Sequence, residues 1–133
     1  KIWKKIEEIF LQDEFTPPTV SDIRRLISVE VKLVNSLFRR LCDLGLLVKV
    51  AKNKCYLSKS ISKLANIIEE IGIDHRAAII DLGIFRHKTG LGRNRAVEIL
   101  EFFDKAGITQ RSSGGRILKS LVSPILSHGP NSK

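Results

Sequence analysis

Basic side chains gather around two glycines in the segment KTGLGRNR, residues 88–95. Arg86 and His87 precede this segment, and no acidic residue occurs between Asp81 and Glu98. Such a composition suits an anion, because cationic side chains hydrogen-bond to phosphate and glycine lets a ligand approach the backbone closely. The segment therefore predicts a site for a phosphate group, either in a nucleotide or in a nucleic-acid backbone.

The spacing of the glycines does not fit a nucleotide-binding loop. A dinucleotide-binding fingerprint needs a third glycine three residues after the second, and Arg95 occupies that position. The fingerprint also needs a parallel βαβ unit, which the hydrophobic pattern does not indicate. The Gly-Lys-Ser/Thr sequence of a phosphate-binding loop is absent. A nucleic acid remains the better candidate.

Arg93 and Arg95 stand where a helix is expected to begin. Apolar residues at i, i+3, i+4 and i+7 predict a helix over residues 92–106, with both arginines in its first turn. A helix N-terminus is partly positive, so a cation there costs roughly 0.3–1 kcal/mol. The matching turn earlier in the chain holds Glu30. A bound phosphate would make the arginines favourable; otherwise they reach into solvent or toward Glu98.

Further candidates flank this helix start. Three basic residues end the preceding short helix, and two arginines flank a predicted hairpin loop. His87 is as consistent with an ordinary surface histidine as with a residue that contacts nucleic acid. The residues predicted to bind nucleic acid are Arg86, His87, Lys88, Gly92, Arg93, Asn94, Arg95, Arg111 and Arg116.

The chain resembles itself when it is shifted by 62 residues. KKIEEI at residues 4–9 aligns with NIIEEI at residues 66–71, and the apolar pattern continues without a gap. This self-similarity predicts two modules of one fold. Their predicted bounds are residues 1–58 and residues 59–120. The join falls at residues 58–60, and a C-terminal tail covers residues 121–133.

The helices of each module follow one pattern. In the first module, Thr19 or Ser21 can cap the second helix. In the second module, the short helix covers residues 82–88 and follows an apolar run at residues 77–80 that could form a strand. The third helices are expected at residues 30–44 and 92–106, each ended by a glycine in the left-handed conformation, Gly45 and Gly107.

A β-hairpin is expected to close each module. LLVKV pairs with KCYL in the first, and GITQR pairs with RIL in the second. Three helices followed by a hairpin form a winged helix, a relative of the helix-turn-helix. The predicted fold class is therefore mostly α with small β-hairpin wings (α+β), as two tandem winged-helix domains. In the second module the turn at residues 89–92 contains both glycines, which allow positive φ there at no steric cost.

The composition favours an anionic partner and no catalysis. The net charge is +9 and the pI is near 9.9, which favours nucleic acid over a merely lysine-rich surface. The sequence has no run of about 18 apolar residues, so no membrane span is predicted. Cys42 and Cys55 are expected to be buried, reduced thiols. The three histidines have no spacing that metal or triad chemistry requires, so no metal, cofactor or enzymatic activity is expected.

The kind of nucleic acid is constrained by the body of the third helix. Beyond Arg95 this helix is acidic, with Glu98, Glu101 and Asp104. Phosphates lining a DNA major groove would repel it, so contact through the helix start and the wing is favoured. Such a small footprint suits an RNA hairpin recognised by shape. The few aromatic residues argue against a surface that stacks single-stranded bases.

One segment resembles a known family. FRHKTGLGRNRAVEILEFFDKAGITQR, residues 85–111, is similar to the last winged helix of bacterial selenocysteine-specific elongation factors. IWKK at residues 2–5 and LANIIEE at residues 64–70 fit the preceding winged helix and the junction, so the resemblance covers about residues 1–120. Two departures stand out: Gln110-Arg111 replaces two basic residues, and Asn94-Arg95 replaces Arg-Lys followed by an apolar residue.

The resemblance implies a specific role. In that family the C-terminal winged helices bind the selenocysteine-insertion hairpin of messenger RNA, and a separate N-terminal part hydrolyses GTP and carries the tRNA. The final winged helix contacts the hairpin, and the one before it is mainly a spacer. Carried over to this chain, the family arginine is Arg93 and the wing position is Arg111. A cytoplasmic monomer that meets the ribosome as part of the full-length factor, with no membrane partner, is then expected.

Two other functions remain open from the residues alone. A DNA-binding transcription regulator with tandem winged helices would bind duplex tightly, although the acidic third helix disfavours it. A protein-interaction module would expose an apolar patch, for which Val29, Val31 and Leu33 are candidates.

Overall fold

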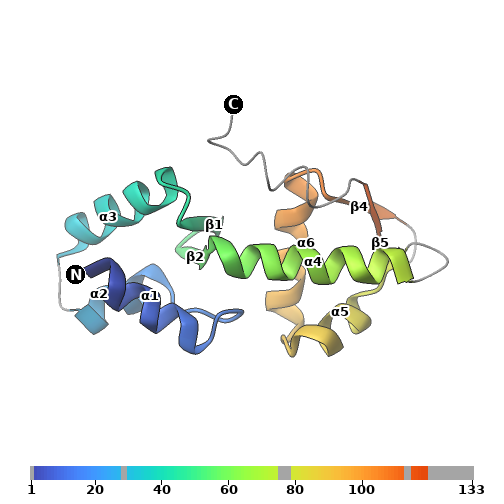
Figure 1. Ribbon diagram of the computed structural model, residues 1–133, viewed down its shortest axis with the longest axis horizontal. Coiled ribbons are helices and arrows are strands. Elements are labelled where there is room, and N and C mark those ends of the chain that lie inside the picture. The colour runs from blue at the N-terminus through green and yellow to red at the C-terminus, as the bar shows by residue number, and fades with distance from the viewer. Residues whose placement is uncertain (1, 28–29, 75–78, 113–114, 120–133) are drawn as a thin grey trace. The chain divides into compact units, whose positions relative to one another are not determined.

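The computed structural model describes residues 2–27, 30–74, 79–112 and 115–119 (Figure 1). The chain divides into two compact units, Lys1–Ile61 and Ser62–Lys133. Helices dominate both units, and each unit has a small antiparallel sheet.

The first unit places three helices before a hairpin. Its elements are α1 (Ile2–Gln12), α2 (Val20–Ile27), α3 (Val31–Asp43), β1 (Leu47–Ala51) and β2 (Lys54–Leu57). Apolar side chains at helical spacing make one face of each helix hydrophobic and so drive it into a shared core. The core comprises Ile6, Phe10, Ile23, Val34, Phe38, Leu41, Leu47, Cys55 and Leu57.

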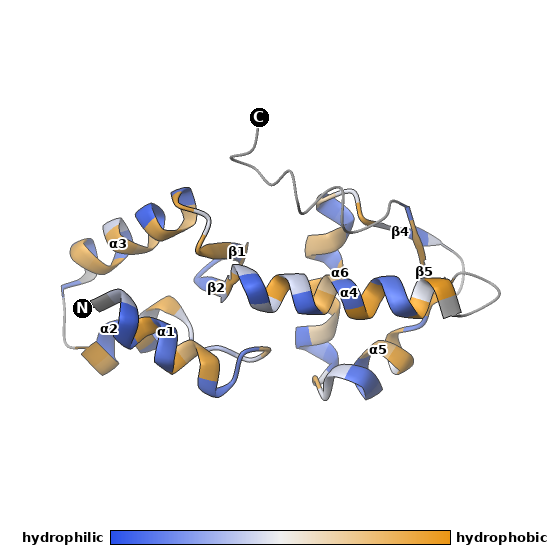
Figure 2. Cartoon of the chain, viewed as in Figure 1, coloured by the Kyte–Doolittle hydropathy of each residue, from blue (hydrophilic) through white to orange (hydrophobic). Residues whose placement is uncertain are grey.

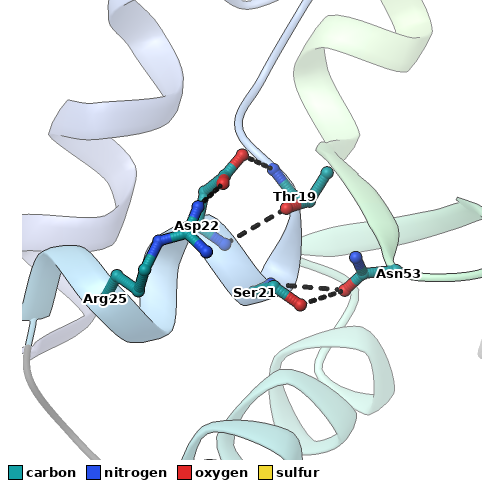
Figure 3. A network of polar contacts seen from close by, with 5 residues as sticks. All are labelled: Thr19, Ser21, Asp22, Arg25 and Asn53. Carbon is teal, nitrogen blue, oxygen red and sulfur yellow. Dashed lines mark hydrogen bonds and ion pairs between the residues drawn. The ribbon is translucent and has the colours of Figure 1, made fainter.

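A polar network fixes the start of α2 and joins it to the hairpin turn (Figure 3). Thr19 Oγ1 accepts from the Asp22 N–H at 3.1 Å, and the Asp22 carboxylate accepts from the Thr19 N–H at 3.0 Å. The latter bond is the main reason that the pKa of Asp22 is lowered. The Ser21 N–H donates to the Asn53 side chain at 3.2 Å, and the Val20 N–H donates to the Asn53 carbonyl at 3.1 Å. Thr19 is therefore the cap, and Ser21 instead binds the hairpin turn.

The second unit has the same order of parts with one additional strand. Its elements are α4 (Ser58–Asp74), β3 (Ile79–Ile80), α5 (Leu82–Thr89), α6 (Arg93–Lys105), β4 (Thr109–Ser112) and β5 (Gly115–Leu118). Bands of apolar and polar residues alternate along α4 (Figure 2), as a half-buried helix requires. The strands form an antiparallel sheet in the order β3-β5-β4. The strand considered at residues 77–80 exists at Ile79–Ile80, and residues 77–78 lie outside the described ranges.

The 62-residue repeat is visible in the helix bounds. Shifted by 62, the bounds of α2 become those of α5, and the bounds of α3 become those of α6. Gly45 and Gly107, each just past the end of its third helix, have φ of 81° and 82°. The predicted helix ends are thus confirmed, because a residue with a side chain is strained at such φ.

The join between the modules is helical. The segment predicted to join the modules, residues 58–60, forms the first turn of α4. Ser58 Oγ donates to the Gly45 carbonyl, and Ser60 Oγ, completely buried, donates to Glu14 at 2.9 Å. These bonds attach the first turn of α4 to the first unit, and the compact units meet at Ile61 and Ser62 rather than at residue 58.

Candidate nucleic-acid interface

Helix α5 is fixed at its start and carries the basic residues at its end. The Asp81 carboxylate caps it by accepting from the Ile84 N–H at 3.1 Å. Phe85 is completely buried and anchors the helix to the core. Arg86, His87 and Lys88 make up the last turn and are all exposed. Cations are favourable at this end of a helix, so α5 presents three basic side chains without strain.

The turn between α5 and α6 is held by local hydrogen bonds. Gly90, with φ of 77°, donates its N–H to the Arg86 carbonyl at 2.7 Å. Thr89 Oγ1 donates to the Phe85 carbonyl at 2.8 Å and accepts from the Leu91 N–H at 3.3 Å. Arg86 Nε donates to the Leu91 carbonyl at 3.3 Å, which holds its guanidinium against the turn. The turn therefore keeps Arg86 beside the start of α6.

The N-terminus of α6 has no side-chain cap. Gly92 occupies the capping position with φ of −72°, an extended conformation that any residue adopts. Of the two glycines in this turn, Gly90 has positive φ and Gly92 does not, because the chain reversal is completed before the helix begins. The first helical bond is donated by Ala96 to the Gly92 carbonyl. The N–H groups of Arg93 and Asn94 precede that bond and have no partner within the helix.

The arginines of this first turn differ from one another. Arg93 and Asn94 are exposed, and the Arg93 side chain makes no hydrogen bond or ion pair with any residue that the structure describes. Arg95 is half-buried and has a partner within the chain, as does Glu98. The first turn contains no acidic residue. Arg93 is consequently the arginine best placed to meet an external anion.

The two wing arginines have different surroundings. Arg111 and Arg116 are partners in the β4–β5 register, and Arg111 is exposed. The Arg116 side chain is only 9% exposed, and its Nε donates to both Asp104 carboxylate oxygens, at 3.1 and 3.0 Å. Thr109 Oγ1 donates to the same carboxylate at 2.6 Å. The prediction that Arg116 is a binding residue conflicts with this placement, because Arg116 joins the wing to α6 instead.

Sequence reasoning missed the buried Asp104–Arg116 pair. Asp104 was grouped with the acidic body of α6, yet its carboxylate is engaged by the wing. The signal was the possible strand at residues 77–80: with β3 present, β5 becomes the central strand of the sheet, and Arg116 pairs with Ile80. A charged residue in a central strand is buried and needs an opposite charge nearby.

Among the described residues of the first unit, the starts of α2 and α3 differ from that of α6, although α3 also has no side-chain cap bond. The N–H groups at the start of α2 are taken by Asp22 and Asn53 (Figure 3). Glu30 occupies the capping position of α3, so a negative side chain stands where the second unit has Gly92. A negative residue there favours the helix and repels an anion. Of the apolar patch considered for a protein partner, Leu33 is 61% exposed, whereas Val29 lies outside the described residues.

The comparisons with known proteins agree with this geometry. Residues 74–118 match the family model described as "Elongation factor SelB, winged helix". Over these residues the chain is therefore similar to the winged helix of elongation factor SelB. The predicted resemblance and the winged-helix fold are thereby confirmed for the segment that contains α5, α6 and the wing.

A solved structure of a SelB protein is similar over most of the chain. It is described as the structure of the mRNA-binding domain of elongation factor SelB from E. coli in complex with SECIS RNA. The match has a TM-score of 0.78 and 26% sequence identity, and it covers 90% of this chain and 94% of that one.

Two curated relatives are selenocysteine-specific elongation factors. The one from Escherichia coli (strain K12) is 29% identical over 121 residues, which is 91% of this chain and 19% of the relative. The one from Haemophilus influenzae is 22% identical over 100 residues, 75% of this chain and 16% of the relative. The chain thus spans less than a fifth of the length of these SelB relatives.

Two other kinds of site are not found among the described residues. Among the helices that the structure describes, none has the length and apolar character needed to cross a membrane. Within the same residues, no three His, Cys, Asp or Glu side chains are grouped so that they could hold a metal ion.

Proposed function

We propose that this chain binds a hairpin of messenger RNA through the end of α5, the turn at residues 89–92 and the first turn of α6. The observation that carries the proposal is the uncapped N-terminus of α6, where Arg93 is exposed and no acidic residue balances it. The chain's similarity to an mRNA-binding domain in complex with SECIS RNA supports the same assignment.

A phosphate of the RNA backbone can accept hydrogen bonds from the uncapped N–H groups at the start of α6. The free N–H groups of Arg93 and Asn94 donate to one phosphate, which also meets the positive end of the helix dipole. The Arg93 guanidinium adds a charge-assisted bond to the same or the next phosphate. Arg86, held against the turn by the Leu91 carbonyl, and Arg111 on β4 supply further cations. His87, Lys88 and Gly92 are exposed on the same segment and remain in the proposed site.

The two units have different roles in RNA binding. Residues 1–61 contain 12 Lys and Arg against 7 Asp and Glu, and residues 62–133 contain 11 against 7, so their net charges are +5 and +4. Bulk charge therefore does not decide which unit reads the RNA. The deciding feature is the uncapped start of α6, where Arg93 is exposed and the first turn has no acidic residue. We therefore assign RNA binding to residues 59–120. Residues 1–58 act as a spacer, because the start of α2 is bound by its own hairpin turn.

The binding module belongs to a larger factor in this account. The SelB relatives are selenocysteine-specific elongation factors, and the chain aligns with only 19% of the E. coli protein. Bound to a selenocysteine-insertion hairpin, the module would tether the factor beside the UGA codon on the ribosome. GTP hydrolysis would take place in another part of the protein, and the module itself would act by binding, as a monomer, in the cytoplasm.

The alternative of a DNA-binding regulator is weaker. Laying α6 into a major groove would place the exposed Glu101 and the half-buried Glu98 against phosphates. Contact through the helix start avoids this repulsion, and the similarity to SelB proteins favours RNA.

Backbone amide shifts in NMR spectra test the site directly. Adding a selenocysteine-insertion hairpin should move the amide signals of Gly92, Arg93 and Asn94 most strongly. The amides of Val20 and Ser21 provide a control within the same chain, because their N–H groups are already bonded to Asn53. Large shifts at residues 19–21 with none at residues 92–94 would contradict the proposed interface.

A further inference from the structure

The first unit contains two cysteines, and neither belongs to the proposed RNA site, which is in the second unit. Cys42 is in the last turn of α3, and Cys55 is in β2, opposite Lys49 in the β1–β2 register. Neither forms a disulfide in the structure, and Cys42 packs against the core cluster that contains Cys55. Side chains from two different elements therefore bring two thiols to the same part of the core.

Both thiols border a cavity that lies within this unit. The cavity has a volume of about 790 Å³ and is enclosed by α2, α3 and the hairpin. Arg24, Arg39, Lys49 and Lys52 line it, against a single acidic residue, Asp43. The excess of cations means that the cavity attracts small anions over neutral or cationic molecules.

The two thiols are not equivalent. Cys55 is only 5% exposed, and burial, together with the neighbouring Cys42, raises its pKa to about 12. Cys42 is half-buried; burial raises its pKa, whereas the hydrogen bond with Cys55 lowers it. A thiolate is the attacking species in thiol–disulfide exchange. Cys42 is thus the thiol that ionises first and meets a molecule in the cavity, with Cys55 beside it.

We propose that Cys42 and Cys55 form a dithiol site that exchanges with small anionic disulfides and closes into an internal disulfide. The Cys42 thiolate attacks one sulfur of the disulfide, breaking its S–S bond and releasing one thiolate, which takes up a proton. Cys55 then loses its proton and attacks the Cys42 sulfur, releasing the second thiol. The protein loses two electrons and two protons, and the small disulfide is reduced to two thiols.

The new bond would cross-link the end of α3 to β2. It closes a short loop that contains β1 and the hairpin turn, and such a constraint reduces the freedom of the unfolded chain. The oxidised first unit should therefore melt at a temperature higher by roughly 10–25 °C than the reduced one. The RNA site in the second unit contains neither cysteine, so the proposal stands independently of the proposed function.

The test uses the whole reduced chain and two disulfides of opposite charge. Oxidised glutathione is anionic and cystamine is cationic, and both provide the same S–S bond. We expect oxidised glutathione to react at least about tenfold faster at low salt, with the difference shrinking near 1 M salt, where charges are screened. Intact mass should fall by two hydrogen atoms, and peptide mapping should join Cys42 to Cys55. The rate should rise with pH as the Cys42 thiol ionises.

Variants separate the steps. Cys55→Ser should stop at a stable glutathione adduct on Cys42, and Cys42→Ser should react slowly because only the buried thiol remains. Arg39→Ser should slow the reaction with oxidised glutathione, whereas the neighbouring Arg40→Ser should not, because Arg40 does not line the cavity. Circular dichroism checks that each variant is folded. Intermolecular dimers as the main product, or equal rates with both disulfides at low salt, would overturn the proposal.

Discussion

Replacing Arg93 by alanine tests whether this arginine binds RNA or stabilises the fold. Arg93 is the first residue of α6, and its cation opposes the positive end of the helix. Removing it should stabilise the fold by about 0.3–1 kcal/mol, with alanine's higher helix propensity adding a few tenths. Because Arg93 is exposed, the lower half of that range applies. A rise in melting temperature of roughly 2–4 °C is expected.

The same change should weaken RNA binding. A hydrogen bond to a charged group contributes about 1.5–3 kcal/mol. Each 1.4 kcal/mol corresponds to about tenfold in affinity, so the dissociation constant should increase by roughly 10- to 100-fold. Fluorescence anisotropy with a labelled selenocysteine-insertion hairpin measures this change, and thermal melting measures the stability in parallel.

Lys105→Ala is the matched control on the same helix. Lys105 is exposed at the last turn of α6, where a cation interacts favourably with the helix dipole. Its removal should leave hairpin affinity within about twofold and give no stabilisation like that of Arg93→Ala. If Arg93→Ala lowered the melting temperature and left the affinity unchanged, Arg93 would be structural and the reasoning about the open helix start would be refuted.

Four further outcomes are expected. Lys49→Ala and Lys54→Ala, in the wing of the first unit, should change hairpin affinity by no more than about twofold in the same binding assay, because that unit is a spacer. The logarithm of the affinity should fall linearly with the logarithm of salt concentration, with a slope set by a handful of phosphate contacts, and a flat profile in a salt titration would argue against backbone binding. Gly115→Ala should destabilise the chain by at least about 1–3 kcal/mol in urea unfolding, because a Cβ there would lie 2.9 Å from both the side chain of one β3 residue and the backbone of the next. Asp104→Asn should cost about 3 kcal/mol in the same measurement, since it leaves the buried Arg116 guanidinium without its charge partner.

The fold was largely predictable because its signals are local. The apolar spacing gave α2, α3, α5 and α6, and glycine at 45 and 107 ended the third helices as expected. These features depend on residues within one or two turns, where helix periodicity and capping operate. The 62-residue shift added independent support, since the same pattern occurs twice.

Contacts between distant residues could not be read from the chain. The hydrogen bond from the Ser21 N–H to the Asn53 side chain joins residues 32 apart. It depends on the geometry of the hairpin turn, which no local pattern encodes. Ser60 and Glu14 are 46 residues apart, and no local pattern predicts the hydrogen bond between them. Likewise, the position of Arg116 beside the wing loop does not show that it is buried. Its burial depends on β5 being the central strand of the sheet.

The candidate site was predictable where it depends on sequence position. The placement of Arg93 and Arg95 in the first turn of α6 follows from the helix start alone and is confirmed by the structure. The difference between them does not follow: Arg95 is half-buried with a partner, and Arg93 is exposed. Side-chain surroundings depend on packing from elsewhere in the unit, so only the structure separates the two.

Titration of the chain against three ligands tests the central claim most directly. The ligands are a selenocysteine-insertion hairpin, the same hairpin with a scrambled loop, and a duplex DNA of equal length, all at about 0.15 M salt, where long-range charge effects are partly screened. The account predicts that the native hairpin binds at least about tenfold more tightly than either of the others. Equal affinity for all three would mean that the α5–α6 turn senses phosphate alone, and it would contradict the proposed recognition of a messenger-RNA hairpin.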